Sequence, residues 1–216
     1  NTKRIEKLEL DPKRVRPWAL QGRLQDSLGP DRLQDLLDTM PHSGQHQPAI
    51  VRPIDDDPQY THEVIDGSRR RAACEILGRK LEALSRPMTD LEAVMVVQSA
   101  DDQQKHSAYE EALRWATWIA QGIFDSASAL ADKLKRSRGH VSQQLNVALV
   151  PREFLRCWGD HDKVPRPIYL RLASLMAKAK QAGRLEAITE ALKERGIQQQ
   201  AAGQGAKEAV VALAEV

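Results

Sequence analysis

The chain has 216 residues, a formal net charge of +2, and 41% hydrophobic and 29% charged residues. This composition is ordinary for a folded globular protein, and the length allows one large domain or two small ones. The mild net charge excludes a nucleic-acid surface built on overall charge, so any such surface must come from local clustering. Two cysteines without metal-ligand spacing do not fit a disulfide framework, and no apolar run approaches the ~20 residues of a membrane span.

Residues 1–100 have the pattern of a mixed α/β domain. Period-two alternation predicts strands, and apolar residues at helical spacing predict helices. The expected strands are 5–10, 49–53, 60–65 and 81–84, and the expected helices are 32–40, capped by Asp31 and ended by 41–44, and 72–77. Strands 49–53 and 60–65 are expected to form a hairpin.

A run of ten residues, from Val64 to Ala73, leads from the second of these strands through Asp-Gly and three arginines into a helix. Glycine at such a turn lets the backbone approach a ligand, and a helix N-terminus offers unpaired N–H groups. Arginines placed there favour an anion, most plausibly phosphate. The alternative is a hairpin turn followed by a solvated basic helix.

The rest of the chain reads as helical. The expected helices are 90–99, 108–121, 126–134, 138–149, 168–181, 185–195 and 206–216, with a polar linker at 198–205. Trp115 and Trp118 fit core packing better than a stacking platform. The sequence therefore predicts an α+β chain with a mixed domain at 1–100 and an all-α domain at 101–216.

Residues 126–149 have the pattern of a helix-turn-helix, with a short helix capped by Ser126, a tight turn and a second helix. Polar side chains of the second helix suit base edges, and the cations around the turn suit phosphates. The candidate DNA-binding residues are Lys135, Arg136, Ser137, Arg138, His140, Ser142, Gln143, Gln144 and Asn146. An ordinary helical hairpin with a polar face is the alternative. Lys178, Lys180 and Arg184 fit either added phosphate contacts or a solvated face.

Two of these segments carry a resemblance. Gly67-Ser68-Arg69-Arg70-Arg71-Ala72-Ala73 resembles the G-[ES]-R-R-x-x-A box of the ParB family of plasmid and chromosome partition proteins. Gln47-Pro48-Ala49-Ile50-Val51-Arg52 resembles the family's Q-P-[IL]-x-V-R segment at about the usual distance upstream, and Ser107–Ala112 also fits. The combination looks most like the SopB-like branch, over residues 5–151.

The resemblance implies a ParB/sulfiredoxin-like N-terminal domain that binds CTP with Mg²⁺, followed by the helix-turn-helix domain. By motif position, the nucleotide-binding residues would be Gln47, Pro48, Ala49, Gly67, Ser68, Arg69, Arg70 and Arg71. Such proteins bind a centromere-like DNA repeat, close into a clamp around DNA and stimulate a Walker-type partition ATPase. The implied location is the bacterial cytoplasm, on the nucleoid or plasmid.

The chain departs from the family at the E-N-x-x-R motif, because residues 97–105 lack the expected Asn and Arg and hold Asp101 and Asp102 instead. Slow CTP hydrolysis as a switch therefore stays open, as does a transcriptional regulator on the same scaffold without an active switch. A sulfiredoxin-type enzyme would need its cysteine inside the glycine turn, whereas Cys74 follows the arginines. A homodimer is expected through a C-terminal domain that lies outside this sequence.

Overall fold

The computed structural model describes residues 4–22, 25, 28–101, 107–156 and 164–201, with the backbone only for 101 and 197–201. The chain divides into two compact units, 1–105 and 106–216, each with its own core. The expected helix at 206–216 lies outside the described residues. In the part of the chain that is described, no helix is both long and apolar enough to span a membrane.

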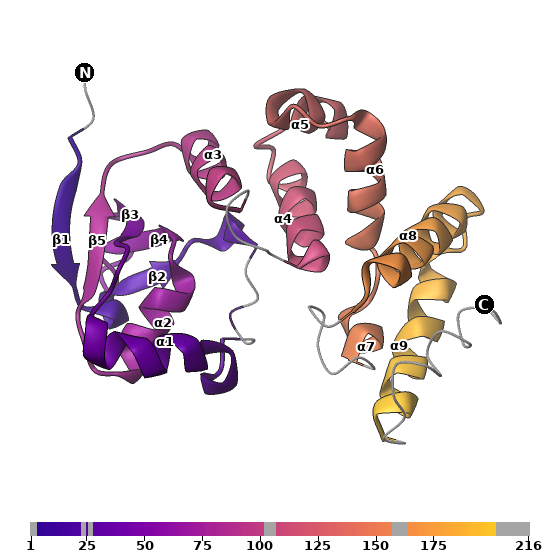
Figure 1. Cartoon of the computed structure of the whole chain (residues 1–216). Coiled ribbons are helices and arrows are strands. Elements are labelled where there is room, and N and C mark those ends of the chain that lie inside the picture. Colours follow the sequence, from indigo (N-terminus) through magenta and orange to yellow (C-terminus); the bar gives the residue numbers. More distant parts are fainter. Residues whose placement is uncertain (1–3, 23–24, 26–27, 102–106, 157–163, 202–216) are drawn as a thin grey trace. The chain divides into compact units, whose positions relative to one another are not determined.

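Unit 1 is built on a five-stranded mixed sheet (Figure 1). The strands are β1 (Glu6–Leu10), β2 (Val15–Pro17), β3 (Ala49–Pro53), β4 (His62–Asp66) and β5 (Leu81–Ser85), in the order β1-β5-β3-β4-β2. β3 and β4 pair antiparallel, which confirms the expected hairpin, while β2 joins β4 in parallel. β2 was not expected, because three residues ending in proline carry too short an alternation to read.

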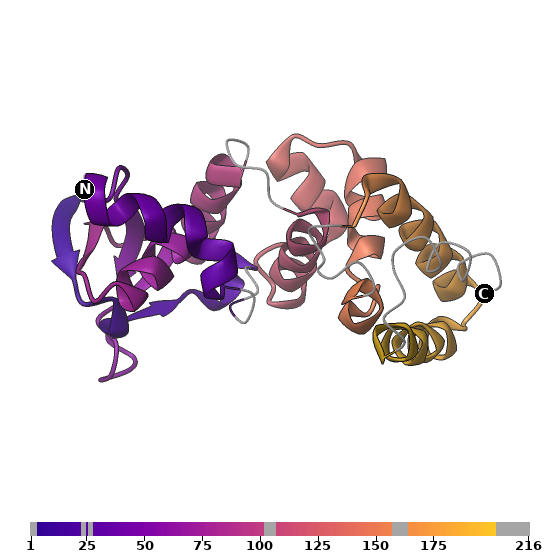
Figure 2. The same ribbon diagram turned by 60° about the horizontal axis from the view of Figure 1, so that its bottom comes forward.

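Helices cover both faces of this sheet, as Figures 1 and 2 show. α1 (Pro30–Ser43) and α2 (Ser68–Ile76) bury Met40, Ala73 and Cys74 against inward residues of the strands, among them Val51 and Val64. α3 (Asp90–Asp101) contacts β4 from the other side. Two 3-10 turns, η1 (Pro12–Arg14) and η2 (Ala19–Gln21), flank β2.

A chain of ion pairs lies on the α3 face of the sheet. Neighbouring strand residues point to opposite faces, so Arg52 and Glu63 face away from the core that holds Val51 and Val64. Buried Glu63 pairs with Arg16 at 2.6 Å and with Arg52 at 2.8 Å, and Arg52 reaches Asp90 at the start of α3 at 2.7 Å. These contacts tie β2, β3, β4 and α3 together.

Unit 2 is all helical in its described residues. The helices are α4 (Ala108–Ala120), α5 (Ala127–Leu134), α6 (Arg138–Val147), α7 (Arg152–Leu155), α8 (Arg166–Gln181) and α9 (Leu185–Ala201). Trp115 and Trp118 are fully buried on α4, which confirms their core role. The α+β class expected from the sequence is correct.

Three helices differ from the expectation by more than two residues at one end. α1 continues through Pro41 to Ser43, because proline tolerates helical φ and removes only one hydrogen bond near the end of the helix. α2 begins at Ser68, so the three arginines form its first turns rather than a turn before it. α9 continues past Gly196 to Ala201 through part of the expected linker.

Candidate nucleotide-binding and DNA-binding sites

The glycine that precedes the arginines is positioned by its backbone. Gly67 is the N-cap of α2 and has φ 102°, in the left-handed region that favours glycine. A Cβ built on Gly67 would lie 2.9 Å from the Cβ of Ala49, so only glycine lets β4 turn into α2 against the start of β3. The turn therefore brings the two sequence boxes into contact.

Arg70 joins these boxes through hydrogen bonds. Its guanidinium donates to the carbonyl oxygens of Gln47 and Pro48 at 2.9 and 3.0 Å, and it pairs with Asp66 at 2.8 Å. Ser68 is buried and donates from its hydroxyl to Oε1 of Gln21 in η2. The structure thus gathers Gln47, Pro48, Ala49, Gly67 and Arg70 at one end of α2.

The other two arginines point elsewhere. Arg69 donates to the carbonyl of Arg32 at 2.8 Å and pairs with Asp35 at 2.5 Å, both on α1. Arg71 donates to the carbonyl of Val15 at 2.6 Å and pairs with Glu75 at 3.1 Å. Successive helical residues are about 100° apart, so three consecutive arginines reach three different neighbours.

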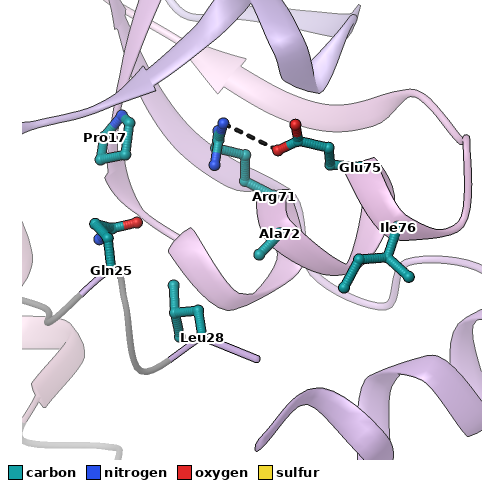
Figure 3. A pocket seen from close by; sticks show the side chains of 7 residues that line it. All are labelled: Pro17, Gln25, Leu28, Arg71, Ala72, Glu75 and Ile76. Atoms are coloured by element: carbon teal, nitrogen blue, oxygen red, sulfur yellow. Dashed lines mark ion pairs between the residues drawn. The ribbon is translucent and has the colours of Figure 1, made fainter. Parts of the chain in front are cut away.

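Arg71 and its partner line a shallow open pocket of about 290 Å³ (Figure 3). The pocket lies on the exposed side of α2, facing the segment after β2, and is lined by Pro17, Gln25, Leu28, Arg71, Ala72, Glu75 and Ile76. Of the expected nucleotide-binding residues, Arg71 lines this pocket.

Two features of the described residues bear on metal and thiol chemistry. No group of three His, Cys, Asp or Glu side chains among the described residues is placed to hold a metal ion. The side chains of Asp101 and Asp102 lie outside the described residues. Cys74 is buried, and burial raises the pKa of its thiol, as is typical of a structural cysteine rather than a nucleophile.

A short turn joins α5 and α6, in the segment where a helix-turn-helix is expected. Ser126 and Ser137 are the N-caps, and each accepts a hydrogen bond from the backbone N–H three residues on. Between the helices Lys135 has φ 53°, a left-handed conformation that ends α5 and turns the chain. Leu130, Ala131 and Val141 are buried, so both helices anchor by one face.

Most of the candidate DNA-binding side chains are open to solvent. Lys135, Arg136, Ser137, Arg138, Ser142 and Gln143 are exposed, and His140 and Asn146 are half-buried. Ser137 is occupied with capping: its Oγ lies 3.2 Å from the donating N–H of His140. These residues form a polar and basic surface along α6 and the turn before it.

Gln144 was wrongly expected on this surface. Its side chain is buried, and its amide Nε2 donates to the carbonyl of Ala108 on α4 at 2.6 Å. Gln144 follows Val141 by three residues, so it shares the inward face of α6. It positions α6 against α4 and is not available to a base.

His140 lies edge-on to Trp115, with ring centroids 5.9 Å apart. Burial lowers the pKa of the His140 imidazole, and the nearby charges of Arg136 and Arg166 lower it further. The neutral ring is therefore favoured at the start of α6, within a cluster of cations.

The structure is thus that of a two-unit protein: a mixed α/β unit in which α2 starts after Gly67 with Ser-Arg-Arg, then a helical unit in which a short turn joins α5 and α6. Residues 1–106 match the ParB N-terminal domain family. Protein SopB of Escherichia coli O157:H7 is 30% identical over 140 residues, which are 65% of this chain and 42% of SopB. The first unit of the chain therefore belongs to the ParB N-terminal domain family.

Two further proteins are similar to this chain. The nucleoid occlusion protein of Oceanobacillus iheyensis is 27% identical over 169 residues, or 77% of this chain and 56% of that protein. The second is a solved structure, the C-terminally truncated chromosome-partitioning protein ParB of Caulobacter crescentus in complex with the centromeric parS site. It is 18% identical with a TM-score of 0.47, and the match covers 89% of this chain and 99% of that one. The chain spans about half the length of the curated relatives it matches.

Proposed function

We propose that this chain is a sequence-specific DNA-binding protein of plasmid or chromosome partition that grips a centromere-like repeat through α5 and α6. The observation that carries the proposal is the pair of helices α5 and α6, which a short turn joins, with both helices capped and with Gln143 exposed beside Ser142. A glutamine amide can pair with both the N6 and N7 positions of adenine in the major groove.

The distribution of charge supports this assignment. Unit 2 contains 16 Lys and Arg against 12 Asp and Glu, whereas unit 1 contains 16 against 18. Within unit 2, Lys133, Lys135, Arg136 and Arg138 gather around the turn before α6. Cations at this position reach the phosphates that flank a recognition helix.

Gln143→Ala tests base recognition by α6. On a duplex selected from a random pool by the chain itself, we expect binding to weaken by about 1–3 kcal/mol, with little change on random duplex. Gln59→Ala, at an exposed glutamine of unit 1, is the matched control and should change neither affinity. Equal losses of Gln143→Ala on selected and random duplex would remove Gln143 from base readout.

We also propose that unit 1 binds CTP with Mg²⁺ at the start of α2, where the resemblance to the family places the nucleotide. Gly67 leaves the backbone open there, and a helix N-terminus favours phosphate. Arg70 already holds the Gln47–Ala49 segment beside this helix end, so the two boxes are preassembled. Slow hydrolysis of this nucleotide would open and close a clamp around DNA.

Calorimetric titration with CTP, ATP and GTP in the presence of Mg²⁺ tests the nucleotide site. We expect selective CTP binding, lost in the double variant Arg69→Ala with Arg70→Ala and retained in Lys80→Ala, an exposed cation outside the box. DNA affinity should be the same in all three proteins. No nucleotide binding by the unmodified chain would leave a DNA adaptor without a switch, and phosphate release on CTP measures hydrolysis.

The partners follow from the same proposal. A Walker-type partition ATPase and a second copy of the chain, joined through a C-terminal domain, would complete a partition complex on plasmid or nucleoid DNA in the bacterial cytoplasm. The competing role is a regulator of transcription on the same scaffold. Mapping the bound sites on replicon DNA separates a clustered repeat from dispersed promoters.

A further inference from the structure

The helix α8 carries charge of one sign only. Between residues 164 and 185 the sequence holds no Asp or Glu, and it holds five Lys and Arg side chains. All five are exposed on α8 or in the turn that follows it: Arg166, Arg171, Lys178, Lys180 and Arg184. We name these five residues the α8 basic row.

The cations of the α8 basic row have no ion-pair partner in the part of the chain that the structure describes. None of the five makes an ion pair with any other residue that the structure describes. The arginines of unit 1 behave differently, since Arg52, Arg69 and Arg70 each face a carboxylate at 2.8 Å or less. Unpaired cations on a helix without acids mark a surface for a polyanion.

The α8 basic row begins beside the helix-turn-helix. α8 packs on α6 through buried residues that include Leu172 and Met176. Arg166, at the start of α8, is close enough to His140 of α6 for its charge to lower the pKa of that imidazole. Arg171 and Lys178 are seven residues apart, which places them on one side of α8 with about 10 Å between them along the axis.

We propose that the α8 basic row is a second phosphate-binding surface for duplex DNA, which extends the contact of α5 and α6 along the backbone. The inference rests on the proposed binding of duplex DNA by unit 2. It assigns α8 a direct role in affinity for DNA of any sequence, in addition to its packing against α6.

The chemistry of α8 favours DNA over a membrane surface. A helix that lies on a bilayer needs a free apolar face for the acyl boundary. The apolar face of α8 is buried inside unit 2, and Leu170, at 39% exposure, is the one large hydrophobic residue of α8 that is exposed. Exposed cations on a helix without a free apolar face match the phosphate backbone of a duplex instead.

The test is the salt dependence of binding to a random-sequence 30-base-pair duplex. For a protein that neutralises phosphates, log K falls with log[NaCl] by about 0.9 for each contact. We expect the triple variant Arg171→Gln, Lys178→Gln, Lys180→Gln to lower this slope by about 2–3. The triple variant Lys7→Gln, Lys13→Gln, Lys80→Gln removes the same charge from unit 1 and should leave the slope unchanged.

A variant that preserves charge separates the effect of charge from an effect on folding. Arg171→Lys keeps the charge and should keep the slope, whereas loss of folding would appear in circular dichroism and in the binding of all ligands alike. Equal slopes for the two triple variants would overturn the proposal. The proposal would also be overturned if the α8 triple variant lost binding to anionic vesicles or to single-stranded RNA but kept its binding to the duplex. Because the duplex is random, failure of base readout at Gln143 is measured separately and does not affect this result.

Discussion

Adding a methyl group at Gly67 tests how strongly the contact between the two sequence boxes depends on the backbone conformation of this residue. Gly67→Ala would hold alanine at φ 102° and push its Cβ to 2.9 Å from that of Ala49. We expect unit 1 to lose about 1–3 kcal/mol of stability, measured by urea unfolding. Gly78→Ala is the control, because Gly78 also has positive φ but nothing within 4 Å of its Cβ. Equal losses would show that the contact with Ala49 relaxes.

In the turn between α5 and α6, Lys135 supplies a positive charge but lowers the stability of unit 2. A side chain in the left-handed region costs about 1–2 kcal/mol, which glycine avoids. We expect Lys135→Gly to stabilise unit 2 by about 0.5–1 kcal/mol and Lys133→Gly, inside α5, to destabilise it by about 1 kcal/mol. Both variants remove one cation and should weaken DNA binding alike. Thermal unfolding and duplex titration measure the two effects, and a destabilising Lys135→Gly would refute the account.

At single positions, the sequence predicted which residues lie near a site better than it predicted where their side chains point. Gln143 and Val141 lie on the faces that their spacing indicates, and Gln144 could have been placed correctly, since it follows Val141 by one helical turn. The partners of Arg69 and Arg71 could not have been predicted, because Asp35 and Val15 come from distant segments of the chain. Only the tertiary fold decides which carboxyl or carbonyl group an arginine meets.

Among the helices, Gly196 is the position where an element depends on close packing. It lies inside α9, and an added Cβ would lie 2.6 Å from Cα of Phe154 on α7. Because Cα is a backbone atom, it can move away only if α7 itself shifts. We expect Gly196→Ala to destabilise unit 2 by about 1–3 kcal/mol in thermal unfolding. Gly139→Ala in α6, with nothing within 4 Å, should stabilise by about 0.5–1 kcal/mol instead. Stabilisation by both substitutions would mean that α7 and α9 separate freely.

The same glycine explains why the extent of α9 was not predicted. Glycine near the end of an apolar pattern is typical of a helix terminus, so the expected helix stopped at 195. Here glycine serves instead to let α7 approach, and the helix continues to Ala201. By contrast, β3, β4 and β5 were predicted within two residues, because alternation and flanking turns mark them in the sequence itself.

Across the whole chain, the two structural units also differ in how their charged residues are arranged. In unit 1, Arg69, Arg70 and Arg52 pair with Asp35, Asp66 and Glu63, while the α8 basic row of unit 2 is exposed and pairs with no carboxylate that the structure describes. The sequence could show the basic clusters but not which cations were already paired. A net charge of +2 therefore conceals one acidic unit and one basic unit.

Among the residues that the structure describes, each unit also holds one half-buried histidine, which makes stability depend on pH. Burial lowers the pKa of His62, whose ring nitrogens contact the hydroxyls of Thr61 and Ser85, and burial with nearby cations lowers that of His140. Both imidazoles are neutral in the folded chain above their lowered pKa values, whereas the unfolded chain takes up protons from about pH 6.5. Stability is therefore full above pH 6.5 and falls as the pH drops through that value toward the folded pKa values.

Urea unfolding between pH 7.5 and 5.5 measures this dependence. We expect the free energy of unfolding to decrease over that range in the unmodified chain, and to decrease less in the double variant His62→Asn with His140→Asn, whatever its absolute stability. Each single variant should flatten the profile of its own unit alone, because the two histidines lie in separate cores. An unchanged pH profile in the double variant would contradict the assignment of the pH dependence to these two histidines.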